Sequence, residues 1–256
     1  MPTPSSLSSL TTSHGLISSF STFLTIAIHT ILSARAVYPP ASFLAARAYN
    51  HPVRQNRHPR VCAWITDAVR AVEVQLRTGD VARVVVVLFA PPGSGRRQRA
   101  LERFVFDVGR LPVVSAGKGD AVIVREGEEM GDGEERDDGA ERRMMADLEE
   151  EFRAVMGRLM GCGQRLAPIP EGCTFTVAME LKTDGKAPVG HPQAWIPAEG
   201  PLQARREGEA GGGEDGRVVR GGDLEGQKVT AVRTVDVGEM AFEMWIEEGK
   251  AKWDDG

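Results

Sequence analysis

The chain contains 256 residues, of which 41% are hydrophobic, and it carries a formal net charge of −5. This length suits one large domain or two small ones, and the hydrophobic share is sufficient for a packed core. The negative net charge argues against a general nucleic-acid-binding protein, which would be strongly basic. The cysteines at positions 62, 162 and 173 are too few and too scattered for a disulfide framework or a zinc site, so we expect free thiols in a reducing compartment.

An apolar run near the N-terminus follows a lead-in rich in Ser, Thr and Pro (residues 1–14), which we expect to be disordered. The run begins at Gly15 and has no charged residue before Arg35, so a membrane span, a targeting segment and a core helix all have to be considered. Its polar side chains recur at steps of three and four, as on one side of a helix: Ser18, Thr22, Thr25, His29 and Ser33. A lipid-facing span would not usually carry this stripe, and a secretory signal would begin with a basic segment. We therefore predict a buried core helix, with the other two interpretations as alternatives.

A second helix and a hairpin are predicted next. Pro59 stands at the favoured first-turn position of a helix that ends at Gly79, because the apolar residues between them recur with helical spacing. The β-branched run at 82–90 predicts a buried strand, and residues 101–108 predict its hairpin partner.

Two low-complexity insertions interrupt the second half of the chain. Residues 115–140 and 203–226 are rich in Gly and in charged residues, and we expect both to be solvated loops. Between them, apolar residues at helical spacing from Met144 to Leu159 predict a third helix, and residues 173–181 alternate as a strand. The stretches "KVTAVRTVDV" and "MAFEMWIEE" predict two final strands. This order of elements favours a single α+β domain.

The turn after the first predicted strand, "APPGSGRRQRA", partly matches a phosphate-binding loop. That motif is G-x-x-x-x-G-K-[ST], and here Ala90, Arg96 and Arg97 replace its first glycine, its lysine and its hydroxyl residue. Only Gly95 fits, so we interpret the segment as a basic hairpin turn and keep a nucleotide-binding enzyme only as an alternative. The arginines of this turn and of the next strand are interpreted as a solvated charged surface. Because no metal-ligand spacing or catalytic set is present, we expect no catalytic residue, metal ion or cofactor.

Tryptophans are favoured anchors of binding sites. Trp64 lies on the predicted second helix and Trp195 lies in "PQAWIPAEG"; both are candidate anchors, with a place in the core as the alternative. In the last predicted strand, Glu243 and Trp245 point outward if the apolar residues that alternate with them face the core. An outward tryptophan beside an acid indicates a second contact surface, and a partly covered rim residue is the alternative.

Several sequence blocks resemble the HORMA-domain family. They are "FLTIAIHTILSARAVYPPASF", "YNHPVRQNRHPRV", "VVVVLF" followed by "ERFVFDV", and "PEGCTFTV". Within the family they are most similar to the accessory subunit of DNA polymerase zeta, a mitotic-arrest-deficient-like adaptor of translesion synthesis. The resemblance keeps the family order over residues 16–110, 144–181 and 229–250, and the two insertions have no counterpart in it.

The resemblance implies a fold and a domain organisation. We expect one HORMA domain over residues 15–250, in which three main helices pack on a mostly antiparallel sheet. The region at about 182–250 would form the mobile C-terminal "safety belt" that closes over a partner peptide. The peptide would add a strand to an open sheet edge, and closure of the belt would make its dissociation slow.

The resemblance also implies partners and site residues. In this branch the trapped peptide contains proline and comes from the catalytic subunit of DNA polymerase zeta. The two aromatic positions that grip it fall on Trp64, which is a tyrosine in animal relatives, and on Trp195. A second surface binds the C-terminal domain of the Y-family deoxycytidyl transferase. It falls on Val229, Glu243 and Trp245, in place of the usual leucine, glutamine and tyrosine.

A third position, Arg153, matches the arginine through which family members form homodimers or heterodimers along the third helix. The alternative is an exposed helix arginine with Glu149 one turn earlier. Taken together, the resemblance implies a non-catalytic adaptor of DNA polymerase zeta in the nucleus, with the cytoplasm as a second location, and with no cofactor, no membrane association and no direct nucleic-acid contact. A spindle-checkpoint or meiotic-axis HORMA adaptor is the alternative within the family.

Overall fold

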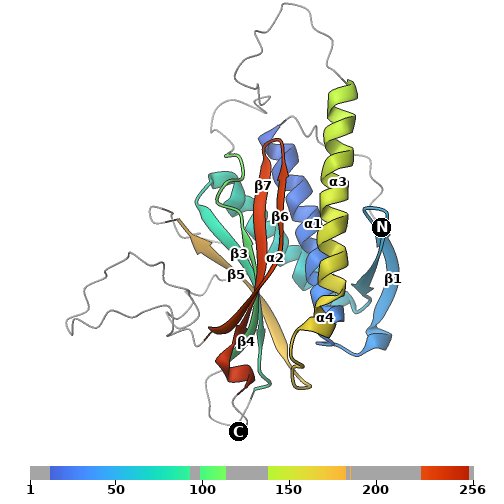
Figure 1. The fold of residues 1–256 in the computed structure, drawn as a ribbon, viewed down its shortest axis with the longest axis vertical. Coiled ribbons are helices and arrows are strands. Elements are labelled where there is room, and N and C mark those ends of the chain that lie inside the picture. The colour runs from blue at the N-terminus through green and yellow to red at the C-terminus, as the bar shows by residue number, and fades with distance from the viewer. Residues whose placement is uncertain (1–11, 93–98, 114–137, 183–184, 186–225, 254–256) are drawn as a thin grey trace, which may run out of the picture.

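The computed structural model describes residues 12–92, 99–113, 138–182, 185 and 226–253 (Figure 1). Helices and strands both form in these ranges, which confirms the predicted α+β class. In chain order they are α1 Ser13–Ala34, β1 Phe43–Ala48, β2 His51–Asn56, α2 Pro59–Thr78, β3 Val81–Phe89, β4 Ala100–Asp107, α3 Asp138–Met160, α4 Cys162–Arg165, β5 Thr174–Leu181, β6 Gly226–Val237 and β7 Met240–Gly249. Short 3-10 helices lie at Pro40–Ser42 and, as η4, at Lys250–Lys252.

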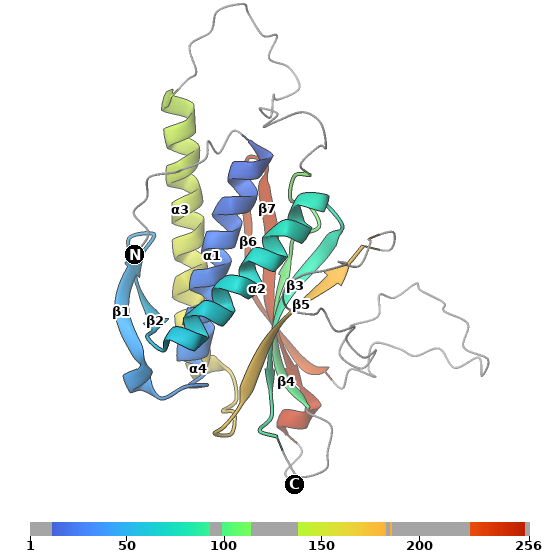
Figure 2. The ribbon, with the colours of Figure 1, turned by 180° about the vertical axis from the view of Figure 1, so that it is seen from behind.

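The large sheet has the strand order β5–β3–β4–β7–β6, and every pair of neighbours is antiparallel. Helices α1, α2 and α3 cover one face of it, and Figure 2 shows α1 and α2 in front of the strands. Apolar side chains from the three helices and from the covered face form one buried cluster. At its centre the rings of Phe23 on α1 and Phe152 on α3 stack with their centroids 4.4 Å apart. The sheet therefore has an inner face covered by helices and an outer face on which no helix of the described residues packs.

Helix α1 is the central helix of the core. Its N-terminus is capped by Thr12, whose hydroxyl accepts a hydrogen bond from the Gly15 N–H at 3.0 Å. Within the described residues, α1 is the one helix long and apolar enough to cross a membrane, but 72% of its most apolar window is buried inside the fold. The prediction of a core helix is confirmed.

Only some residues of the polar stripe of α1 face solvent. Thr22 is exposed, whereas His29 is only 5% exposed because β2 packs over α1. The Asn56 N–H at the end of β2 donates to His29 Nδ1 at 3.4 Å. Burial lowers the pKa of His29 to about 4, so the imidazole is neutral near pH 7 and serves as an internal acceptor.

The other main elements lie where the sequence predicts them. Helix α2 begins at Pro59 and ends at Gly79, whose φ of 78° is the left-handed conformation that glycine adopts without strain. Strands β3 and β4 form the predicted hairpin, and β6 and β7 form another at the end of the chain. Helix α3 ends at Met160 and is followed by the single turn α4.

No sequence pattern predicted the β1–β2 hairpin, which forms a two-stranded sheet of its own beside α1 and α3. Alanines in β1 and Pro52 in β2 give these segments weak strand signals. The turn between the strands holds Tyr49 and Asn50 at φ values of 49° and 53°. Its tertiary contacts, rather than local propensity, explain why this hairpin forms.

Several predictions fall outside the described residues. They concern most of the lead-in 1–14, most of the insertions 115–140 and 203–226, and Trp195. Two boundaries differ from those expected, because α1 already begins at Ser13 and α3 at Asp138. Both helices start with small or polar residues, whose composition alone is indistinguishable from that of a loop.

A buried charge network joins the C-terminal end of β7 to the rest of the fold. The Arg35 guanidinium binds both carboxylate oxygens of Glu102, at 2.8 and 2.7 Å. The Lys252 ammonium, on η4, binds Glu102 and also Glu248, the latter at 2.6 Å. The Ala167 backbone completes the network, since its carbonyl accepts from Arg35 at 2.6 Å and its N–H donates to Glu248 at 3.2 Å. The four side chains are at most 4% exposed.

This network contains two cations and two carboxylates, so its formal charges balance. Burial alone would raise the pKa of Glu248, but the hydrogen bond and the charge of Lys252 outweigh burial and hold the pKa below its ordinary value. Because the folded pKa is lowered, this contribution to stability is present above the unfolded pKa and is lost as the pH falls through the folded pKa. A missing partner would leave a charge buried without compensation.

We predict that Lys252→Met lowers the free energy of unfolding by about 3 kcal/mol, because Glu102 then keeps only Arg35 and Glu248 keeps only the half-exposed Lys228, at 3.4 Å. Chemical denaturation followed by circular dichroism measures the loss. Arg70→Met is the control, because the Arg70 side chain is 74% exposed and lies 4.0 Å from Asp67. Its loss should stay below about 1 kcal/mol. Equal losses in the two variants would contradict the role of the network.

Candidate partner-binding surfaces

Strands β5 and β6 lie at the two edges of the large sheet. Strand β5 pairs with β3, and no strand of the described chain pairs with its other side. The β6 edge is less regular, because a bulge interrupts it between Ala231 and Arg233, and Arg158 of α3 donates to the Val232 carbonyl. An unpaired, regular edge presents N–H and C=O groups to an additional strand. Within the described structure, β5 is therefore the better acceptor for an extended peptide.

Trp64 lies on α2 beside this edge strand. Its indole packs edge-on against the ring of Phe175 on β5, with centroids 4.9 Å apart and an interplanar angle of 79°. Tyr38 approaches Phe175 in a similar T-shaped contact at 6.4 Å. Trp64 is half-buried, so it packs on the core while part of its ring stays accessible. Trp64 therefore packs partly on the core, and its role as an anchor stays a prediction. The other candidate anchor, Trp195, lies outside the described residues.

The residues of the second predicted surface share the outer face of β6 and β7. Glu243 is exposed, Trp245 is half-buried, and Val229 is 67% exposed. Val229 pairs with Glu247, which lies on the same side of β7 as Glu243 and Trp245. The apolar residues that alternate with them are buried toward the helices, as the sequence predicts: Phe242, Met244 and Ile246.

Trp245 points outward, but its ring is not free. Its Nε1–H donates to Glu247 at 2.8 Å, and the Arg83 guanidinium carbon lies 5.4 Å from the ring centroid. The ring also packs on a small apolar cluster of the outer face that includes Val85 and Val105. Trp245 therefore stabilises the sheet as well as forming part of its surface, which corresponds to the partly covered rim residue of the sequence analysis.

Charged side chains surround this cluster on the outer face. Arg83 binds Asp107 at 3.2 Å and Glu180 at 3.1 Å. Arg103, one of the arginines in the basic stretch after β3, binds Glu247 at 2.8 Å and also Glu180. Arg103 is therefore a partner of two carboxylates and not a solvated cation. Gly95, Arg96 and Arg97 of the turn that resembles a phosphate-binding loop lie outside the described residues.

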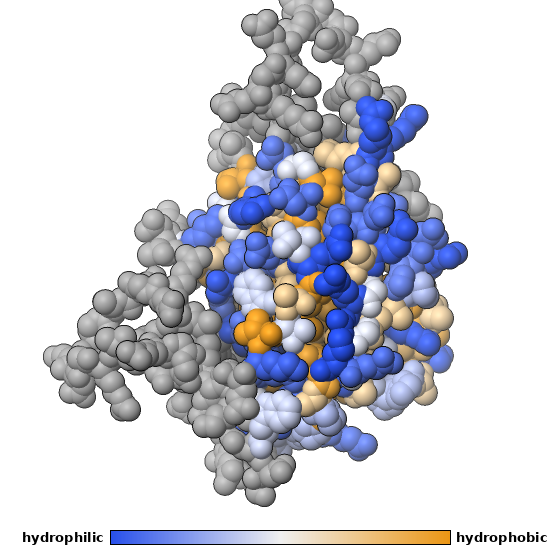
Figure 3. All heavy atoms as spheres, viewed as in Figure 1, coloured by the Kyte–Doolittle hydropathy of each residue, from blue (hydrophilic) through white to orange (hydrophobic). Residues whose placement is uncertain are grey.

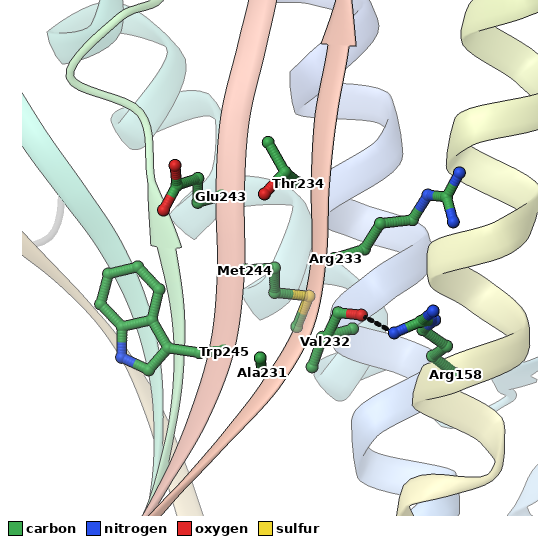
Figure 4. Close-up of a pocket in the computed structure, with 8 residues that line it drawn as sticks. All are labelled: Arg158, Ala231, Val232, Arg233, Thr234, Glu243, Met244 and Trp245. Carbon is green, nitrogen blue, oxygen red and sulfur yellow. Dashed lines mark hydrogen bonds between the residues drawn. The ribbon is translucent and has the colours of Figure 1, made fainter.

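A shallow pocket of about 370 Å³ lies where β6 and β7 approach α3 (Figure 4). Figure 4 shows Glu243 and Trp245 on one side of the two strands, and Arg158 and Arg233 on the side of α3. Arg233 binds Glu151 of α3 through two contacts of 2.6 and 2.7 Å. The pocket thus includes two of the three residues of the second predicted surface. In Figure 3 single hydrophobic residues lie among hydrophilic ones over this hairpin.

Arg153 lies on α3 and is half-buried. Its Nε–H donates to the carbonyl of Tyr49, in the turn between β1 and β2, at 3.1 Å. The side chain therefore connects α3 to the β1–β2 hairpin, a contact that neither the dimerisation role nor a freely exposed helix arginine had implied.

Metal and thiol chemistry find no support in the described residues. No group of three or more His, Cys, Asp or Glu side chains in these ranges could hold a metal ion. Burial raises the pKa of Cys162 to about 11 and also raises the pKa of Cys173, which makes both thiols poor nucleophiles near pH 7.

Comparison with known proteins gives a consistent set of relatives. The chain is 31% identical to the DNA polymerase zeta processivity subunit of Schizosaccharomyces pombe, over 90% of this chain and 91% of the relative. It is 29% identical to the human mitotic spindle assembly checkpoint protein MAD2B, over 62% of this chain and 63% of that protein. No family model matches the chain.

Solved structures show the same fold at low sequence identity. A chain of the Mitotic Checkpoint Complex crystal structure matches with a TM-score of 0.60 and 16% identity, over 93% of this chain and 96% of that one. HTP-2 of C. elegans, bound to the HIM-3 closure motif, matches with a TM-score of 0.52 and 11% identity, over 90% and 88% of the two chains.

We predict that Trp245→Ala lowers the free energy of unfolding by about 1–2 kcal/mol, because it removes the stacked guanidinium contact and uncovers the outer apolar cluster. Val229→Ala on the same face should change it by less than about 0.5 kcal/mol, because that side chain is already solvated. Urea denaturation of both variants checks the difference. A Trp245→Ala effect no larger than that of Val229→Ala would show that the ring only projects into solvent.

Proposed function

The chain belongs to the HORMA-domain family, in the branch that contains the DNA polymerase zeta processivity subunit and MAD2B, and from this we propose that it is the adaptor subunit of DNA polymerase zeta in translesion DNA synthesis. As a HORMA adaptor it acts by holding other proteins together. In the proposed role it traps a peptide of the polymerase catalytic subunit and bridges it to the Y-family inserter polymerase in the nucleus.

The observation that carries the proposal is the open edge of β5 beside Trp64. A peptide in extended conformation would pair with β5 through its backbone, and the exposed part of the Trp64 ring would contact a peptide side chain such as proline. The solved complex of HTP-2 with the HIM-3 closure motif supports peptide capture on this fold. Trp195 would supply the second aromatic contact.

The strand order supports the proposed safety belt at about 182–250. The last hairpin joins the sheet through β7 and β4, at the end away from β5. The chain between Leu181 and Gly226 has to connect opposite edges of the sheet, which are about 20 Å apart at four strand spacings. In the proposed domain, residues 15–250, this connection crosses the bound peptide and slows its release.

The second proposed contact is the outer face of the last hairpin. Val229, Glu243 and Trp245 would bind the C-terminal domain of the Y-family deoxycytidyl transferase. Their shared face, and the small exposed Ala231 opposite Trp245, support this assignment. Dimerisation with a second HORMA protein through Arg153 is a further proposal, and it would have to accommodate the hydrogen bond between Arg153 and Tyr49.

A spindle-checkpoint adaptor is the second candidate. It is supported by the similarity of the chain to MAD2B, a mitotic spindle assembly checkpoint protein, and to a chain of the Mitotic Checkpoint Complex. The two candidates differ in the peptide that binds at β5, so a polymerase peptide and a checkpoint peptide offered to the same protein distinguish them.

We predict that Trp64→Ala weakens binding of the polymerase catalytic-subunit peptide by about 2 kcal/mol, because it removes a central aromatic contact. Isothermal titration calorimetry measures this. Trp64→Phe keeps a ring against Phe175 and should lose less, and Thr66→Ala, exposed on the same helix, should lose nothing. Unchanged affinity of Trp64→Ala would reject the peptide clamp.

We also predict that Glu243→Lys weakens binding of the deoxycytidyl transferase C-terminal domain at least about tenfold, because it reverses the one charge among the three residues of the second surface. Glu239→Lys makes the same charge change at the exposed tip of the hairpin and should bind normally. Surface plasmon resonance compares the two. Equal binding by both variants would remove this surface from the proposal.

A further inference from the structure

Four exposed arginines gather at the β1–β2 hairpin and the start of α2. Arg47 lies on β1, Arg54 on β2, Arg57 just after β2, and Arg60 in the first turn of α2; together they are called the arginine patch. The first acidic residue of the chain is Asp67, so no carboxylate from the local sequence offsets these charges. Figure 3 shows hydrophilic side chains along this side of the molecule, over α3 and the hairpin.

The guanidinium groups of the patch form no ion pair with any residue that the structure describes. None of the four forms an ion pair or side-chain hydrogen bond with a described residue, whereas Arg35, Arg83, Arg103 and Arg233 all bind carboxylates. An arginine side chain that stays unpaired and exposed keeps its donors available for an external anion.

The backbone holds the four arginines in a defined arrangement. Arg47 pairs with Pro52 and Arg54 pairs with Ala45, so the two arginines are diagonal neighbours on one face of the hairpin, about 7–8 Å apart. The Arg57 N–H donates to the Ser42 carbonyl at 2.8 Å, which continues the pairing of the hairpin toward α2. Arg47 and Arg54 therefore share one face of the hairpin, and Arg57 and Arg60 follow between the end of β2 and the first turn of α2.

The side chains around the arginine patch favour a phosphate backbone over an acidic protein as its partner. Small side chains stand opposite Arg47 and Arg54, and Leu44, the large exposed hydrophobic residue of the hairpin, lies on the opposite face. A protein interface would need buried aromatic or aliphatic anchors between its charges. A nucleic-acid backbone offers closely spaced phosphates and needs only cations, and guanidinium groups match phosphate geometry well.

We propose that the arginine patch binds the phosphate backbone of duplex DNA without reading its sequence. The net charge of −5 does not oppose this contact, because the acidic residues lie elsewhere in the sequence and the positive charge is concentrated on one hairpin. The patch would place DNA beside the adaptor while the β5 edge and the outer face of β6 and β7 stay available to proteins.

The test measures fluorescence anisotropy of a fluorescein-labelled duplex of about 20 base pairs with the full chain, at salt concentrations from about 50 to 200 mM. Micromolar binding at low salt is expected, with a log–log salt slope of about −3 to −4 for four phosphate contacts. Arg47→Gln/Arg54→Gln should weaken binding at least about tenfold and reduce the slope by about 2. Arg57→Gln/Arg60→Gln should do the same, so that a folding defect in one double variant does not decide the result.

The matched control is Arg70→Gln/Arg110→Gln. It removes the same charge from exposed arginines that already face carboxylates, Asp67 at 4.0 Å and Asp236 at 3.2 Å, and should bind the duplex like the wild type. Patch variants that bind like this control would overturn the proposal. It is also overturned if a labelled polyglutamate of equal charge binds as tightly through the same arginines, because an acidic protein segment is then the partner.

This outcome is independent of the proposed adaptor function. Arg47→Gln/Arg54→Gln should keep the wild-type melting temperature and the wild-type affinity for the polymerase peptide, since both side chains are exposed and lie on a two-stranded sheet separate from β5. The peptide comparison uses this variant alone, because Arg60 lies one helical turn before Trp64. Loss of duplex binding with intact peptide binding locates DNA contact in the patch. Intact duplex binding with no peptide binding would reject the adaptor function alone.

Discussion

The position of the last hairpin depends on the buried charges at the end of β7. Arg35 at the end of α1 pairs with Glu102 of β4, and Lys252 of η4 joins Glu102 to Glu248 of β7, so the full set of contacts forms only when all four segments are in place. Two carboxylates at this depth without their cations would cost several kcal/mol, whereas the complete set satisfies most of its donors and acceptors. Such a network adds less to net stability than to specificity, because it penalises every arrangement in which the C-terminal segment lies elsewhere. With β7 held on β4, Phe242, Met244 and Ile246 complete the core below α1 and α3.

Periodicity predicted the elements whose burial is one-sided. Helix α2 carries a proline start and a glycine stop, and β7 alternates strictly, so both were recognisable and Glu243 was placed outward from sequence alone. The β1–β2 hairpin was not predicted, because alanines and Pro52 give almost no strand signal. Its formation depends on contacts with α1 and α3. The burial of His29 was not predicted for the same reason, because a polar stripe on a helix does not indicate which neighbouring element will pack over it.

Contacts between charges far apart in the sequence were the least predictable part of the surfaces. The outward direction of Trp245 follows from alternation, but its stacking with Arg83 requires β3 and β7 to lie on either side of β4. Arg103 of β4 looked solvated because its carboxylate partners, Glu180 and Glu247, lie on β5 and β7. Conversely, the total charge concealed the arginine patch, since a sum over the chain carries no information about where the charges lie.

The strand order also has a consequence for synthesis on the ribosome. Strands β3, β4 and β5 are complete by Leu181, but β7, which covers the other side of β4, follows only after Gly226. At about 5–20 residues per second, the growing chain spends several seconds with β4 lacking its second neighbour. During that interval a nascent chain exposes the hydrogen-bonding edges of both β4 and β5, whereas in the described part of the finished fold β4 is paired on both sides. A chaperone that shields unpaired strands would therefore act mainly before the final hairpin emerges from the ribosome.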